Sequence, residues 1–178
     1  MSAHMGRLCA ALVLAVVLSG CGYHLAGHGG KVTVMPEGTQ AIGVRASGAD
    51  ASVLAQSLMT LMQSGSDYTV LRAGDPKAQG VSAVELDIEN VSSQFVPSAY
   101  DSNGYAIQYR LSLSGSVRLM QGETVLWNGG TITASTDIYV QGSGGAGSLQ
   151  ASLSQDRAKR ELRQQWARQA WEALQSGF

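Results

Sequence analysis

The cysteine at position 21 is the residue whose chemistry the sequence specifies best. It ends the tetrapeptide LSGC at 18–21, which matches the bacterial lipobox. In that motif the cysteine thiol receives a diacylglyceryl group, and cleavage makes the cysteine the first residue of the mature chain. Arg7 and the apolar run 8–18 precede it, as in a secretory signal, and the run has roughly half of the ~20 residues that cross a bilayer. We therefore predict that residues 1–20 are a signal peptide, which is removed, and that Cys21 is lipidated.

The segment after this cysteine, GYHLAGHGG, is short and rich in glycine. We predict that residues 21–30 are the lipidated end and a flexible tether, and that residues 31–178 form a single α/β sandwich domain. Cleavage also removes Cys9, so Cys21 is the only cysteine left and no disulfide can form within the mature chain. Aspartate after the lipidated cysteine commonly retains lipoproteins at the inner membrane, so Gly22 is compatible with an outer-membrane location.

Conventional catalytic and metal-binding groups are scarce. The mature chain keeps two histidines, His24 and His28, and both lie in the tether, away from any expected catalytic centre. They are four residues apart, but no third metal ligand is near them. Glu85, Asp87 and Glu89 form a row on an expected strand, where they are either a solvated face or a calcium site. We expect no enzyme activity, no metal and no cofactor besides the covalent lipid.

Positive charge is the remaining candidate for ligand recognition. The net charge of −1 becomes −2 when Arg7 leaves with the signal peptide, which argues against nucleic-acid binding. Arg110 and Arg118 lie eight residues apart on one expected strand face, where guanidinium groups can bind phosphate bidentately. A second basic group lies on the last expected helix: Arg157, Lys159, Arg160, Arg163 and Arg168. Either group could instead be solvent-facing, the helix charges being set against Asp156 and Glu161.

Two helices are expected to position some of these groups. The first covers residues 51–63, with Asp50 placed to cap its free N–H groups. The second covers residues 153–175, with Ser154 as its cap and Gly177 at its end. Apolar residues at helical spacing are expected to face the core: Val53, Leu54, Leu58, Met59, Leu61 and Met62 in the first helix, and Ala158, Leu162, Trp166, Ala170, Ala173 and Leu174 in the second.

Between the helices, apolar and polar residues alternate with a period of two, which predicts strands with one buried face. The turn DSNG at 101–104 and the turn QGE at 121–123 connect hairpins, and Gly129 and Gly130 predict a bulge. The expected strands are 41–45, 68–72, 84–91, 105–113 and 124–140, and a flexible loop is expected at 141–150.

These elements predict an α+β fold with the order β-α-β-β-β-β-α. Both helices need an apolar surface to cover, and the sheet offers one. We therefore expect two helices packed on one face of a mostly antiparallel sheet of four to five strands. The strands 41–45 and 68–72 could be parallel neighbours, joined by a crossover through the first helix.

The N-terminal stretch LSGCGYHLAG, with the order of elements above, resembles the LptE family of lipopolysaccharide-assembly lipoproteins. That family typically begins its mature chain with Cys-Gly, an aromatic residue, His-Leu and a glycine soon after. The resemblance implies an outer-membrane lipoprotein with two helices on one side of a sheet. It also implies a plug-like role in the β-barrel LptD, direct lipopolysaccharide binding, and delivery of lipopolysaccharide to the cell surface.

The resemblance gives the candidate surfaces a role. Arg110 and Arg118, or the cations of the last helix, would pair with the phosphates of lipid A, and the polar sheet face would meet the water-lined barrel lumen. The alternative is an auxiliary lipoprotein of an ABC-type lipid transport system. A peptidoglycan-binding lipoprotein is a third interpretation, which the lack of a glycan-binding aromatic cluster disfavours.

Overall fold

The computed structural model describes residues 34–78, 83–140 and 145–177. The signal peptide and tether predicted over residues 1–30, with Cys21 and both tether histidines, lie outside the described residues. The described elements are β1 (Ala41–Ala46), α2 (Ala49–Gly65), β2 (Thr69–Arg72), the short 3-10 helix η1 (Pro76–Ala78), β3 (Ala83–Tyr100), β4 (Ala106–Gln121), β5 (Thr124–Tyr139) and α3 (Gly145–Ser176).

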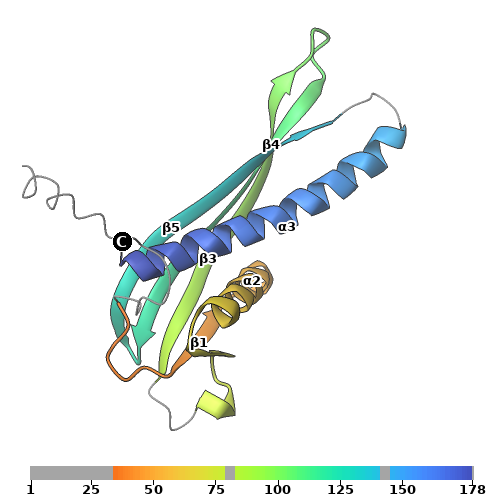
Figure 1. Ribbon diagram of the computed structural model, residues 1–178. Helices are drawn as coiled ribbons and strands as arrows, with labels where there is room; N and C mark the ends of the chain where they lie inside the picture. The colour runs from red at the N-terminus through yellow and green to blue at the C-terminus, as the bar shows by residue number, and fades with distance from the viewer. Residues whose placement is uncertain (1–33, 79–82, 141–144, 178) are drawn as a thin grey trace, which may run out of the picture. The chain divides into compact units, whose positions relative to one another are not determined.

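The five strands form one sheet in the order β2-β1-β3-β4-β5. β1 is parallel to both β2 and β3, whereas β3–β4 and β4–β5 are antiparallel hairpins. The predicted element order and the parallel pairing of the first two strands are confirmed, and the sheet is mixed. α2 and α3 lie on the same face of the sheet, as expected (Figure 1).

The core fills the space between this helix pair and the sheet. Its largest fully buried side chains come from both helices and three strands: Ile42, Leu54, Leu58, Met62, Leu86, Ile88, Leu119, Leu162, Trp166 and Leu174. Trp166 also donates a hydrogen bond from Nε1 to the carbonyl oxygen of Ile132 in β5, at 3.1 Å. Trp171 is buried as well, which the sequence interpretation missed, and Val53 is exposed although it was expected to widen the apolar stripe of α2.

The helix starts differ from those predicted. α2 begins at Ala49 after Gly48, whose φ of 101° marks the cap position, so Asp50 lies in the first turn and is not the cap. α3 begins at Gly145, so helix replaces the loop expected at 145–150 and Ser154 lies inside it. Once a helix has nucleated, each added residue gains one hydrogen bond for one pair of fixed dihedral angles. The packed part of α3 can therefore extend through a segment whose own composition predicts a loop.

The hairpins and the bulge follow the prediction. Asp101 Oδ1 accepts hydrogen bonds from the N–H groups of Asn103 and Tyr105 at 2.9 and 2.8 Å, and Gly104 takes the positive φ of 83° in the turn. The β4–β5 register shifts opposite Gly129 and Gly130, where the bulge was expected. β3 is much longer than predicted and reaches Tyr100.

An irregularity in β3 decides which side chains face the helices. Asn90 has a φ of 53°, and the register with β4 shifts between Glu89 and Ser92. Before this point the even-numbered residues, such as Ile88, are buried under the helices. Beyond it, Val91 and Ser93 lie on the helix side, so the helix-facing side chains become odd-numbered.

Candidate functional site

The sheet face opposite the helices is polar over the middle of all three long strands, and the apolar side chains of Val96, Met120 and Val125 lie nearer its ends. In β4 its residues alternate with the buried Leu111, Val117 and Leu119. Short hydroxyl and amide side chains occupy the middle of this polar face: Ser92, Gln94, Ser112, Ser114, Ser116, Thr131, Thr133 and Ser135. Hydroxyl groups pair across the strands, with 2.9 Å between the Oγ atoms of Ser92 and Ser114. The result is a surface of small hydrogen-bonding groups.

The two arginines predicted to bind phosphate lie on this polar face, and each contacts a carboxylate. Arg110 donates from Nε and Nη2 to the two carboxylate oxygens of Asp137, at 3.0 and 3.2 Å. This hydrogen bonding lowers the pKa of Asp137 below its ordinary value and raises that of Arg110. Arg118 donates to Glu89 at 2.6 Å. Both positive charges are therefore balanced within the sheet, and their phosphate binding stays a prediction.

The acidic row on β3 is also paired with arginine. Arg45, on the neighbouring parallel strand β1, makes ion pairs with Glu85 and, at 3.5 Å, with Asp87 Oδ1, which is buried and accepts no hydrogen bond from a described residue. Glu89 is the partner of Arg118. Within the described residues no cluster of His, Cys, Asp and Glu could hold a metal ion. The sequence interpretation missed Arg45, because its position opposite this row depends on strand register.

Most basic residues of α3 are exposed, and Arg163 is half-buried. Arg157 pairs with Glu161 at 2.9 Å, and Arg163 donates to the backbone carbonyl of Lys159 at 3.1 Å. Within the described part of the chain, no ion pair involves Lys159, Arg160 or Arg168. The structure thus places four of the predicted phosphate-binding residues, 157–163, on one helix, and it separates them from Arg110 and Arg118 on the opposite side of the sheet.

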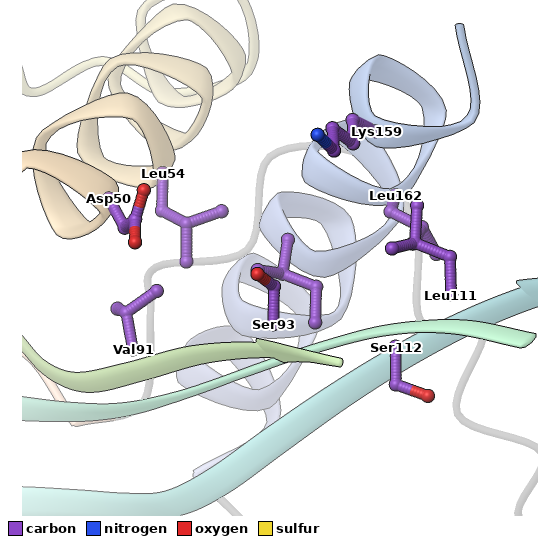
Figure 2. Close-up of a pocket in the computed structure, with 9 residues that line it drawn as sticks. Asp50, Leu54, Val91, Ser93, Leu111, Ser112, Lys159 and Leu162 are labelled. Atoms are coloured by element: carbon purple, nitrogen blue, oxygen red, sulfur yellow. The ribbon is translucent and has the colours of Figure 1, made fainter. Parts of the chain in front are cut away.

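A cavity of about 150 Å³ lies between α2, α3 and the β3–β4 hairpin. Five aliphatic side chains line it: Leu54, Val91, Leu111, Leu113 and Leu162. Ser93 and Ser112 of the hairpin and two exposed charged residues, Asp50 of α2 and Lys159 of α3, complete the lining (Figure 2). The sequence interpretation named neither the cavity nor the presence of these two charged residues in its lining. The helical periodicity that marked Leu54 and Leu162 as core residues was the only available signal.

None of the described helices combines the length and the hydropathy that a membrane span requires.

Comparison with known proteins places these features in context. The family model LptE, described as lipopolysaccharide-assembly, matches residues 39–174. The rare lipoprotein B of Shewanella oneidensis has a similar structure, with a TM-score of 0.59 at 14% identity over 77% of this chain and 95% of that one. A lipoprotein B of Nitrosomonas europaea has a TM-score of 0.58 at 12% identity, covering 81% and 86% of the two chains. At such identities the likeness shows a shared fold. No curated protein matches the sequence significantly.

Proposed function

Because the chain belongs to the LptE family of lipopolysaccharide-assembly lipoproteins, we propose that it acts as the plug-like partner of an LptD-type outer-membrane β-barrel and binds lipopolysaccharide directly. The match to the family covers the whole α/β architecture, from just before β1 into the last turns of α3. Members of this family are not enzymes, so the activity consists of binding and assembly.

The polar sheet face is the observation that carries the barrel partnership. The lumen of an outer-membrane barrel is polar and lined by water. A matching surface needs many small hydrogen-bonding groups and little unbalanced charge. The Ser, Thr and Gln side chains of β3, β4 and β5 supply the hydrogen-bonding groups. The Arg110–Asp137 and Arg118–Glu89 pairs leave little unbalanced charge on the face. This face would form an interface that is buried and not very hydrophobic.

Affinity capture tests the partnership and the face together. The tagged, lipidated protein is recovered from detergent-solubilised outer membrane, and the retained proteins are identified by mass spectrometry. We expect one large β-barrel in about equal amount, and its loss when Ser114→Phe places a bulky ring on the polar face. Thr60→Phe, on the exposed surface of α2, is the matched control and should retain the barrel. Capture of an inner-membrane transporter instead would support the ABC-type alternative.

Lipopolysaccharide binding is assigned first to the α3 cations. Lipid A carries phosphates, and Arg157, Arg160 and Arg163 gather positive charge on α3. Arg160 is exposed and makes no ion pair with a described residue, and the Arg157–Glu161 pair is more exposed than the Arg110–Asp137 and Arg118–Glu89 pairs. Replacement of the three α3 arginines by Gln should therefore weaken lipopolysaccharide binding more than Arg110→Gln with Arg118→Gln. A larger loss from the strand-face double variant would reverse this assignment.

The lipid anchor at Cys21 would hold the domain on the periplasmic side of the outer membrane and within its partner. More than one acyl chain is needed for stable attachment, which a lipobox cysteine provides. Metabolic labelling with palmitate should mark the wild-type protein. The Cys21→Ser variant should remain unlabelled and should leave the membrane fraction unless the barrel retains it.

A further inference from the structure

We propose that the cavity between α2, α3 and the β3–β4 hairpin binds an acyl chain of a zwitterionic phospholipid, with Lys159 contacting the phosphate of the head group and Asp50 its ammonium group. This site is separate from the polar face and from the lipopolysaccharide-binding role of the α3 arginines. It therefore adds a ligand class to the proposed function.

The aliphatic lining suits a hydrocarbon chain. Leu54 and Leu162 close the cavity from the helices, and Leu111 and Leu113 form its floor on β4. The cavity has a volume of about 150 Å³, and a lining that is mainly aliphatic with a few polar groups is typical of sites for apolar ligands. It is large enough for the segment of an acyl chain next to the head group and too small for a whole chain.

The apolar surface continues beyond the cavity along the hairpin. Phe95 lies directly opposite Leu111 in the β3–β4 register, so both side chains are on the helix side of the sheet. Phe95 stacks on Tyr109 with 4.7 Å between the ring centroids, and it stays 41% exposed. Ile107, two residues further along β4, is also 41% exposed. From Leu111 to Ile107 the strand advances roughly 14 Å, which accommodates the part of the chain that does not fit in the cavity.

The two charged residues of the lining select the head group. Asp50 stands at the α2 side and Lys159 at the α3 side, and the amine end of Lys159 points across the cavity towards α2 (Figure 2). No ion pair joins them or links either one to another described residue. A purely anionic head group would be attracted by Lys159 and repelled by Asp50. A phosphate joined to an ammonium group, as in phosphatidylethanolamine, complements both.

Photo-crosslinking in vesicles tests the site. The full-length lipidated protein is reconstituted in vesicles of phosphatidylethanolamine and phosphatidylglycerol. Two vesicle preparations of the same lipid composition are compared. In one the photoreactive group is on the acyl chain of phosphatidylethanolamine, and in the other it is on that of phosphatidylglycerol. We expect crosslinks in the peptides that contain Leu54, Leu111 and Leu162, with a higher yield from phosphatidylethanolamine. Ser93→Phe, which places a ring inside the cavity, should abolish them, whereas Ser114→Phe, on the opposite sheet face, should leave them unchanged.

Charge variants separate head-group recognition from a change in folding. Lys159→Gln should lower the yield from both lipids by up to about fivefold, the range for an exposed ion pair, and the matched control Arg168→Gln should have no effect. Asp50→Asn should shift the preference towards phosphatidylglycerol, because it removes the repulsion of an anionic head group. An unchanged preference in Asp50→Asn would overturn the proposal, and so would stronger labelling by the acyl chains of added lipopolysaccharide.

The same variants distinguish this site from the proposed function. Ser93→Phe should retain barrel capture while losing the lipid crosslinks, and Ser114→Phe should do the reverse. Cavity crosslinks without any barrel capture would refute the partnership and leave the phospholipid site standing. Barrel capture without crosslinks would refute the site alone.

Discussion

Replacement of Gly115 by alanine should destabilise the fold through a contact with Trp166. A Cβ at residue 115 would lie 3.2 Å from Trp166 Cζ2, 3.3 Å from Val91 Cγ2 and 3.5 Å from Leu54 Cδ1. The first two distances are a few tenths of an ångström shorter than ordinary contacts. Trp166 is fully buried and its Nε1 is hydrogen-bonded to Ile132, so the indole ring cannot move freely.

The magnitude follows from two opposing effects. Overpacking of a buried site costs about 1–3 kcal/mol. Replacing glycine by alanine at a position with ordinary backbone angles stabilises by about 0.4–1 kcal/mol, because it restricts the unfolded chain. We therefore expect Gly115→Ala to lower the free energy of unfolding by about 1–2 kcal/mol. Since Val91 and Leu54 also line the cavity, the same strain should reduce the phospholipid crosslinks.

The assay is a double-mutant cycle with Trp166→Phe, measured by urea denaturation of the unlipidated chain and followed by circular dichroism. Phenylalanine lacks the ring atom that the new Cβ meets, so it leaves space at residue 115. In the Trp166→Phe background, Gly115→Ala should raise the free energy of unfolding by about 0.4–1 kcal/mol, whereas it lowers that energy in the wild type. The coupling energy between residues 115 and 166 should therefore exceed about 1 kcal/mol. Equal destabilisation in both backgrounds would refute the idea that Trp166 is the obstacle.

Three further outcomes are expected. Asp137→Asn should make the stability of the protein less sensitive to acid. The hydrogen bonds from Arg110 lower the pKa of Asp137, so the pair stabilises the fold at neutral pH. This stabilisation is lost as the pH falls below the ordinary pKa of 3.8 and Asp137 becomes protonated. Thermal unfolding of wild type and variant between pH values of about 6 and about 3 measures this, and parallel curves would contradict it. Gly129→Ala should lower the free energy of unfolding, measured by urea denaturation, by about 3 kcal/mol or more. The reason is that its Cβ would lie 2.2 Å from Trp127 Cη2. Gly104→Ala should cost about 1–2 kcal/mol in the same assay, because φ is +83° there, whereas no loss would mean that the turn adopts another form.

The sequence favoured the sheet-face arginines as phosphate-binding groups, with the α3 charges as the other candidate, and the fold separates the two groups. Residue type alone made Arg110 and Arg118 as suitable for phosphate as Arg157 or Arg160. In the structure the strand arginines face acidic neighbours 27 and 29 positions away in the sequence. A strand brings its cross-strand partner within ion-pair distance whatever the sequence separation, so these contacts depend on register.

The sequence by itself determined the features that depend on neighbouring residues. The lipobox at Cys21, the family resemblance, the helical spacing around Leu58 and Trp166, and the turn at 101–104 are all local patterns. Periodicity reports which side of an element is apolar, because that side must be covered in any fold of the chain. The order of elements and the single helix-covered face followed from it.

Only the tertiary structure decided the features that join distant segments. The β3 irregularity at Asn90 exchanges the faces of that strand, and it brings Ser93 and Phe95 to the helix side. The cavity exists because two helices and a hairpin meet there, and Asp50 and Lys159 share its lining although they are far apart in the sequence. Strand register, the irregularity at Asn90 and packing are long-range consequences of the whole chain, and no window of local sequence contains them.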